Sequence, residues 1–156
     1  MKPMNVRPTI RQDIPALQSV LKETGLFPAD MLPGLLSNFL TNEDSADLWM
    51  SCEVNGTAVG FCYAVPEQLA DGTWNMLAIA VHPESQGGGH GAALVRSLEA
   101  ALRGRGQRIL IANTSGTDEF SLTCSFYRKN GYVEEARIRD FWAPRDDKVV
   151  FWKRLD

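Results

Sequence analysis

The sequence predicts a mixed α/β fold. Short apolar runs rich in β-branched and aromatic residues alternate with longer stretches whose apolar residues recur every three or four positions, which are the patterns of strands and helices. Asn55-Gly56, the dipeptide most favoured in a tight hairpin turn, joins two of the strand-like runs. A chain of 156 residues is close to the commonest size of one compact unit. We therefore expect a single domain over residues 1–156.

Composition narrows the class of protein. A hydrophobic fraction of 44% with 22% charged residues is that of a globular chain with a packed core. The formal net charge of -3 gives no general attraction for nucleic acid or anionic membranes, which need a basic surface. Residues 1–9 lack the apolar run of a signal peptide, and no stretch approaches the roughly eighteen apolar residues of a membrane span. The expectation is a soluble protein without nucleic-acid or membrane partners.

Cysteine and histidine usage points to a reducing compartment and no metal. Cys52, Cys62 and Cys124 are too few and too scattered for a disulfide scaffold, and none forms a Cys-x-x-Cys pair. The two histidines, His82 and His90, have no grouped carboxylates around them that could complete a metal site. We expect a cytoplasmic protein without a bound metal.

The N-terminal part predicts one strand and two helices. Residues 6–11 resemble a short strand. Asp13 is expected to cap a helix that begins at Ile14, and Gly25 is expected to end it. The apolar spacing over residues 31–40 predicts a second helix.

Three strands follow. Residues 48–54 and 58–65 are rich in aromatic and β-branched side chains and, with the Asn55-Gly56 turn between them, predict an antiparallel hairpin. Residues 74–81 predict a third strand, whose end is apolar at every position, as in a strand buried on both faces.

The C-terminal half predicts a helix over residues 91–103, a strand over 108–113 and a short helix over 122–129. A hairpin of two strands, 132–142 and 148–155, completes the chain. The full order is β-α-α-β-β-β-α-β-α-β-β, typical of one layered α/β structure. The last strands would leave an unpaired sheet edge, through which a homodimer could form.

A glycine-rich loop is the segment that most directly indicates a binding function. The third strand ends at Val81 and the next helix begins near Gly91, with the segment Gln86-Gly87-Gly88-Gly89-His90-Gly91 leading into it. A helix N-terminus presents unpaired N–H groups and a partial positive charge, and glycines let phosphates approach them closely. The loop is therefore predicted to bind an anion, with a plain flexible turn as the alternative.

Two phosphate-loop families fit poorly. A P-loop needs a lysine after its glycines, and none follows here. Gly87, Gly89 and Ala92 satisfy the dinucleotide pattern Gly-x-Gly-x-x-Gly/Ala, but the next strand lacks the acidic residue that would hold a ribose.

Two motifs in order resemble the GNAT acetyltransferase superfamily. Gln86, Gly89 and Gly91 match its pattern Gln/Arg-x-x-Gly-x-Gly/Ala, preceded by Val-His-Pro. The segment Phe126-Tyr127-Arg128-Lys129-Asn130-Gly131-Tyr132 is similar to its Phe-Tyr-x-x-x-Gly-Phe/Tyr element. The resemblance implies a central mixed, mostly antiparallel sheet of about six or seven strands, flanked by about four helices.

The resemblance also implies a reaction and a site. It implies an N-acetyltransferase that moves an acetyl group from acetyl-CoA to a primary amine of a small-molecule or peptide acceptor, by direct attack in a ternary complex. Tyr127 is the implied general acid toward the CoA sulfur, with plain core packing as its alternative role. The implied cofactor-binding residues are Ile79, Ala80, Val81, Gln86, Gly87, Gly88, Gly89, His90, Gly91 and Ala92. The alternative function is a catalytically silent acyl-CoA-binding regulatory module of the same fold.

Some roles stay open in the sequence. Phe120 stands where many family members have an asparagine that contacts CoA, and Asn113 is either its substitute or a polar strand end. The general base is water or one of several carboxylates, namely Glu53, Glu67, Glu84, Asp118 and Glu119. Cys124 is expected in the core. The resemblance implies an acceptor pocket built from the first two helices and the last hairpin, here residues 26–40 and 137–148, but the acceptor is unidentified. Three interpretations of the residues near this pocket stand side by side: an apolar wall of Trp74, Phe141 and Trp142, a basic patch of Arg137, Arg139 and Arg145 that would meet an acidic acceptor, or a solvated hairpin.

Overall fold

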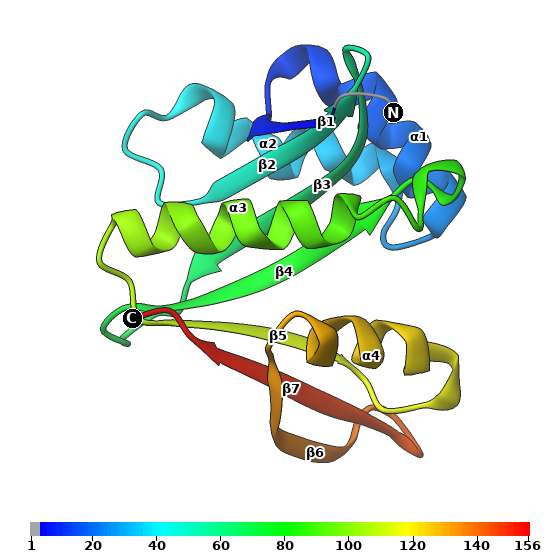
Figure 1. Ribbon diagram of the computed structural model, residues 1–156, viewed down its shortest axis with the longest axis vertical. Helices are drawn as coiled ribbons and strands as arrows, with labels where there is room; N and C mark the ends of the chain where they lie inside the picture. Colours follow the sequence, from blue (N-terminus) through cyan, green and yellow to red (C-terminus); the bar gives the residue numbers. More distant parts are fainter. Residues whose placement is uncertain (1–3) are drawn as a thin grey trace.

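A seven-stranded sheet forms the centre of the computed structural model, which describes residues 4–156. The strands lie in the order β1-β2-β3-β4-β5-β7-β6 (Figure 1). All neighbouring strands pair antiparallel except β4 and β5, which are parallel. The strands are β1 (Met4–Pro8), β2 (Leu48–Val54), β3 (Thr57–Pro66), β4 (Thr73–Val81), β5 (Ile109–Ser115), β6 (Val133–Ala143) and β7 (Asp146–Arg154).

Four α-helices cover the two faces of the sheet. Helices α1 (Ile14–Thr24) and α2 (Leu32–Thr41) pack on one face, and α3 (His90–Gly104) and α4 (Ser121–Lys129) pack on the other (Figure 1). The predicted element order and the mixed, mostly antiparallel sheet are confirmed. Among residues 4–156, none of the helices is both long and apolar enough to span a membrane.

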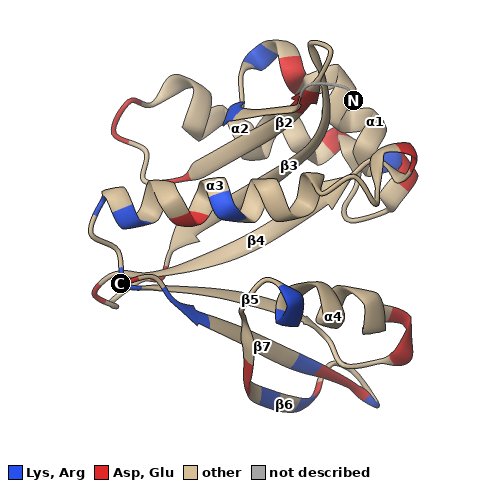
Figure 2. Cartoon of the chain, viewed as in Figure 1, with Lys and Arg blue, Asp and Glu red and all other residues tan. Residues whose placement is uncertain are grey.

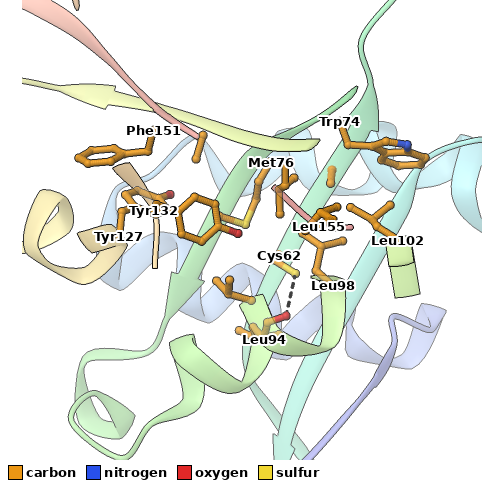
Figure 3. Packing of buried hydrophobic residues seen from close by; sticks show 14 of the residues in the cluster. Cys62, Trp74, Met76, Leu94, Leu98, Leu102, Tyr127, Tyr132, Phe151 and Leu155 are labelled. Atoms are coloured by element: carbon orange, nitrogen blue, oxygen red, sulfur yellow. Dashed lines mark hydrogen bonds between the residues drawn. The ribbon is translucent and has the colours of Figure 1, made fainter. Parts of the chain in front are cut away.

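Each face of the sheet has its own buried cluster. The larger cluster lies under α3 and α4. Leu94, Leu98 and Leu102 of α3 and Tyr127 of α4 belong to it together with Phe151 of β7 (Figure 3). The smaller cluster joins α1 and α2 to the strands through a set of fully buried side chains: Leu17, Val20, Leu21, Leu32, Leu36, Trp49 and Phe61. The three cysteines are free and buried, and Cys124 belongs to the larger cluster as expected.

The two hairpins differ in how well they were predicted. Asn55 and Gly56 have φ values of 54° and 81°, both positive as a type I′ turn requires, so the first hairpin is confirmed. In the second hairpin, β7 begins at Asp146, two residues before the predicted start. Strand β7 is also the inner strand, paired with β5, whereas β6 forms the sheet edge. The acidic residues at the start of β7 therefore lie beside the end of β5.

Asp13 does not cap its helix as predicted. It stands at the N-cap position of α1, but its carboxylate makes no capping bond to that helix. It accepts two hydrogen bonds of 2.8 Å from the Arg7 guanidinium, one of 2.9 Å from the Ile10 amide and one of 3.0 Å from the Ser51 hydroxyl. A paired guanidinium is a stronger donor than a neutral amide, which explains the orientation.

These contacts change how Asp13 titrates. Burial by itself would raise the pKa of the Asp13 carboxyl, but the hydrogen bonds from Arg7, Ile10 and Ser51 outweigh burial and lower the pKa below its ordinary value. The folded chain then holds the carboxylate ionised at a pH where the unfolded chain binds a proton. The contribution of Asp13 is complete above the unfolded pKa of about 3.9 and is lost as the pH falls through the folded value.

We expect Asp13→Asn to lower the free energy of unfolding by about 1.5–3 kcal/mol at pH 7, because a charge-assisted contact to Arg7 is lost. The variant should also lose less further stability than the wild type as the pH falls below about 4. Urea denaturation across this pH range measures both effects. The exposed Asp44→Asn is the matched control, and identical pH slopes for Asp13→Asn and wild type would contradict the assignment.

A partly buried ion pair joins α3 to the C-terminal strand. The Glu99 side chain is 2% exposed and accepts hydrogen bonds from the Tyr132 hydroxyl at 2.7 Å and from Lys153 Nζ at 3.0 and 3.1 Å. Lys153 Nζ also donates to the Asn130 carbonyl at 2.9 Å. Burial, together with the hydrogen bond to Glu99, raises the pKa of Tyr132. This network fixes the chain just after α4.

Glu99→Ala should destabilise the protein by about 2–4 kcal/mol, because it removes the partner of the partly exposed Lys153 ammonium and leaves the Tyr132 hydroxyl without its acceptor. Tyr132→Phe keeps the ion pair and should cost only about 1 kcal/mol. Guanidinium denaturation of both variants measures the difference. Equal losses for the two would show that the ion pair contributes nothing beyond the tyrosine hydrogen bond.

Candidate functional site

The strands β4 and β5 diverge partway along the sheet, as Figure 1 shows. Their pairing ends at Met76 and Ala112. The next residue, Leu77, is a β-bulge, because the β3 register shifts between Tyr63 and Ala64 and leaves Leu77 without an opposite residue. A bulge bends its strand and increases the local twist. The end of β4 therefore turns away from β5.

A cavity of about 450 Å³ lies where the two strands part. Its walls come from the end of β4, the glycine loop and α4. The lining includes every predicted cofactor-binding residue except Gly88: Ile79, Ala80, Val81, Gln86, Gly87, Gly89, His90, Gly91 and Ala92. Gly88 lines a separate cavity beside the β2–β3 turn. From α4 and its C-terminal end come Tyr127, which was predicted, and residues that were not: Leu122, Thr123, Phe126 and Asn130.

The glycine loop has a conformation that other residues would strain. Gly87 and Gly89 have φ values of 85° and 81°, in the left-handed region, and Gly89 is the N-cap of α3. Gln86 Nε2 donates a hydrogen bond of 3.0 Å to the Val81 carbonyl, which ties the loop to the end of β4. These two glycines and this hydrogen bond give the loop its turn into α3.

The loop exposes a row of free amides. Within the described residues, the N–H groups of Gly87–Ala92 donate no hydrogen bond, and the first bond into the helix is from the Ala93 amide to the Gly89 carbonyl at 3.0 Å. His90 Nδ1 lies 2.9 Å from the Ser85 carbonyl and closes the turn. Unpaired amides at a helix N-terminus carry partial positive charge, so this row suits an anion.

Gly91 lets α3 and α4 approach each other. A Cβ at Gly91 would lie 3.1 Å from Cε1 of Phe126. The glycine therefore permits the close contact that puts α4 against the loop and forms the far wall of the cavity.

Tyr127 is both a core residue and a cavity residue. Its side chain is 4% exposed and stacks on Phe151 with ring centroids 5.1 Å apart (Figure 3). Phe126 and Tyr132 meet it edge-on at 5.5 and 5.7 Å. The two roles considered from the sequence, packing and a place in the site, are thus compatible.

The Tyr127 hydroxyl is protonated at neutral pH. Burial raises its pKa above the ordinary value, and the Cys62 and Cys124 thiols add to this effect. In the part of the chain that the structure describes, the hydroxyl makes no hydrogen bond. Its hydrogen is therefore not used by any described residue.

A second cavity, of about 660 Å³, adjoins the first. The two share Ile79, Ala80, Val81 and Gln86, so the end of β4 separates them. Asn113 and Phe120 both line the second cavity and not the first. Asn113 is thus a wall residue of this second cavity, beyond the plain strand end considered from the sequence.

The carboxylates considered as bases are mostly elsewhere. Glu119 lines the second cavity. The others lie outside both cavities: Glu53, Glu67, Glu84 and Asp118. Glu53 is bound by Arg7, and Glu67 by Asn75.

The expected acceptor residues are only partly brought together. Trp142 lines the second cavity, whereas Trp74 is buried at the other end of β4, with its Nε1 donating to Gln107. Arg137 is occupied by surface ion pairs with Glu134 and Asp147. Leu26 and Asp146 line the second cavity from the two regions in which the acceptor pocket was expected, residues 26–40 and 137–148, whereas Ser115 was not found from the sequence. Only the pairing of β7 with β5 puts Asp146 near Ser115, and strand order is not visible in a single sequence.

Comparison with known proteins identifies the family. Residues 45–134, more than half of the chain, match the acetyltransferase (GNAT) domain family. Among curated proteins, no sequence matches this chain. A solved structure of a GNAT-family protein from Desulfovibrio desulfuricans is 26% identical, with a TM-score of 0.91 over 99% of this chain and 100% of the other.

Two further solved structures share the fold at lower identity. The ribosomal-protein-S18-alanine N-acetyltransferase from Escherichia coli is 19% identical, with a TM-score of 0.79 over 99% of this chain and 95% of that one. The Salmonella typhimurium protein yncA, solved with acetyl-CoA as its cofactor, is 17% identical, with a TM-score of 0.77 over 98% of this chain and 94% of that one. With a family match over more than half its length and this fold, the chain belongs to the GNAT acetyltransferase family.

Proposed function

We propose that this protein transfers an acetyl group from acetyl-CoA to a primary amine of a small-molecule or peptide acceptor. One juxtaposition supports the proposal: Tyr127 and every residue of the row of free amides except Gly88 line one cavity, and a second cavity adjoins it across Ile79–Val81. An amine in the second cavity can reach a thioester in the first. Residues 1–156 act as one catalytic domain, and the acetyl group passes directly between the two substrates in a ternary complex.

In this proposal, main-chain groups provide most of the contacts that bind acetyl-CoA. The diphosphate accepts hydrogen bonds from the N–H groups of Gly87–Ala92, and the positive end of the α3 dipole adds to the attraction. Beyond Met76, β4 pairs with no strand of residues 4–156 on its β5 side. The backbone of Ile79–Val81 can therefore pair with the pantetheine amides as it would with an added strand.

Tyr127 is the proposed general acid. The amine nitrogen forms a bond to the thioester carbon, the carbon–sulfur bond breaks, and the departing sulfur takes the proton of the Tyr127 hydroxyl. The raised pKa keeps the hydroxyl protonated in the free protein, so it can donate a hydrogen bond to the sulfur as negative charge develops there. Packing against Phe151 holds the ring in one position, as such a transfer requires.

The attacking amine must be neutral. Among the described residues that line the first cavity, there is no carboxylate. Water is therefore the proposed acceptor of the amine proton, reached from the side of the second cavity.

Gly89→Val should weaken acetyl-CoA binding by about tenfold or more. A β-branched side chain strains the left-handed backbone and stands where the diphosphate would approach the amides. Gly106→Val is the matched control, because Gly106 also has a positive φ of 73° with open space around it but lies outside the first cavity. Calorimetric titration compares the two, and equal affinities in folded variants would reject this location for the diphosphate.

Tyr127→Phe should keep acetyl-CoA affinity and lower kcat by about 10²–10⁴-fold, because the aromatic packing stays and only the acidic hydroxyl is lost. Thiol release at saturating substrates measures kcat, and Tyr132→Phe controls for the loss of a neighbouring phenol. Full turnover by Tyr127→Phe would exclude the acid role. A wild-type protein that binds CoA but releases no thiol with any amine would instead favour the silent regulatory module.

A further inference from the structure

The charge of the second cavity bears on which amine it receives. Its charged lining residues are Glu119 and Asp146, and among the described residues no lysine or arginine lines it. Two acidic residues, Asp118 and Glu119, lie in the segment that leads into α4, which is coloured red in Figure 2. The field in this cavity therefore favours a positively charged occupant.

Asp146 is placed to meet such a charge. Its Oδ1 accepts the hydrogen bond from the Ser115 hydroxyl, and within residues 4–156 the carboxylate has no ion pair. The neighbouring Asp147, by contrast, is paired with Arg137 at 3.2 Å. Of the two adjacent aspartates, only Asp146 keeps its charge unpaired, and it faces the cavity.

Asn113 lies in the same wall. Its Oδ1 is buried and has no hydrogen-bond partner among the described residues. A buried carbonyl oxygen without a donor is costly. A turn of the Asn113 amide toward the cavity is therefore favoured when a ligand brings an ammonium or amine N–H.

Trp142 adds an aromatic surface to this wall. Its Nε1 donates to the Thr114 carbonyl at 3.2 Å, which holds the indole at the cavity, and the side chain is half exposed. The face of an indole attracts a cation more strongly than other aromatic rings do. Lys148, the nearby cation on β7, lies 4.4 Å from the Phe141 ring and outside the cavity lining.

We infer that the acceptor is a small primary amine that carries a second positive charge, held by Asp146, Asn113 and the face of Trp142. This inference rests on the proposed function, because the second cavity is an acceptor site only if acetyl-CoA occupies the first. It also replaces the acidic acceptor considered from Arg137, Arg139 and Arg145, none of which lines the cavity.

Three amines of equal length test the inference: 1,5-diaminopentane, pentylamine and 5-aminopentanoate, whose far ends are positive, neutral and negative. In thiol-release assays with acetyl-CoA, we expect kcat/KM for the diamine to exceed that for pentylamine by about tenfold or more, and 5-aminopentanoate to be the poorest. Asp146→Asn keeps a partner for Ser115 and should reduce the diamine-to-pentylamine ratio toward one. The exposed Asp44→Asn should keep the wild-type ratio.

The outcomes separate this inference from the function on which it rests. Equal kcat/KM values for the three amines, a preference for 5-aminopentanoate, or an unchanged ratio in a folded Asp146→Asn variant would each overturn the second-charge assignment and leave the acetyltransfer intact. Thiol release with none of the three, in a protein whose melting temperature still rises with CoA, would also overturn it. A melting temperature that does not respond to CoA would contradict the proposed function itself.

Discussion

The end of hydrogen bonding between β4 and β5 at Met76 is the constraint on which the site depends. A continuous parallel pair would leave no room between the strands and no free backbone on β4. The bulge at Leu77 bends β4 away, while β5 continues along β7 as far as Ser115. One irregular residue thus opens two adjoining cavities on either side of the β4 end. The helices then only need to close the walls.

The far wall is rigid because its residues belong to the core. Tyr127 stacks on Phe151 and meets Tyr132, whose hydroxyl donates to Glu99, the buried partner of Lys153. Stability and the proposed chemistry therefore draw on the same contacts. The glycine loop contributes in a different way. Its amides are available to a ligand because nothing within the described chain pairs with them. The proposed site combines a fixed tyrosine with an unfilled row of donors.

Local sequence patterns predicted the helices and strands. Pairing between distant residues decided the strand order and the bulge, which the sequence did not reveal. The Asn55-Gly56 hairpin and the glycine loop were visible because their signals lie within a few residues of each other. The bulge was not visible, because every residue from Leu77 to Val81 is apolar and gives no alternation to interrupt. The insertion of β7 between β5 and β6, which brings Asp146 to Ser115, depends on strand order. Asp13 was assigned to its helix because Arg7 is a neighbour only after β1 has formed.

The central claim is that the free amides of Gly87–Ala92 receive the diphosphate of the coenzyme. Amide resonances followed by NMR during titration of the full chain with CoA test it most directly. The account predicts the largest shifts at Gly87–Ala92 and at Ile79–Val81, with little change around the α3–β5 turn at Gly106. Shifts concentrated instead around Asn55 and Thr57, in the cavity beside the first hairpin, would contradict the account.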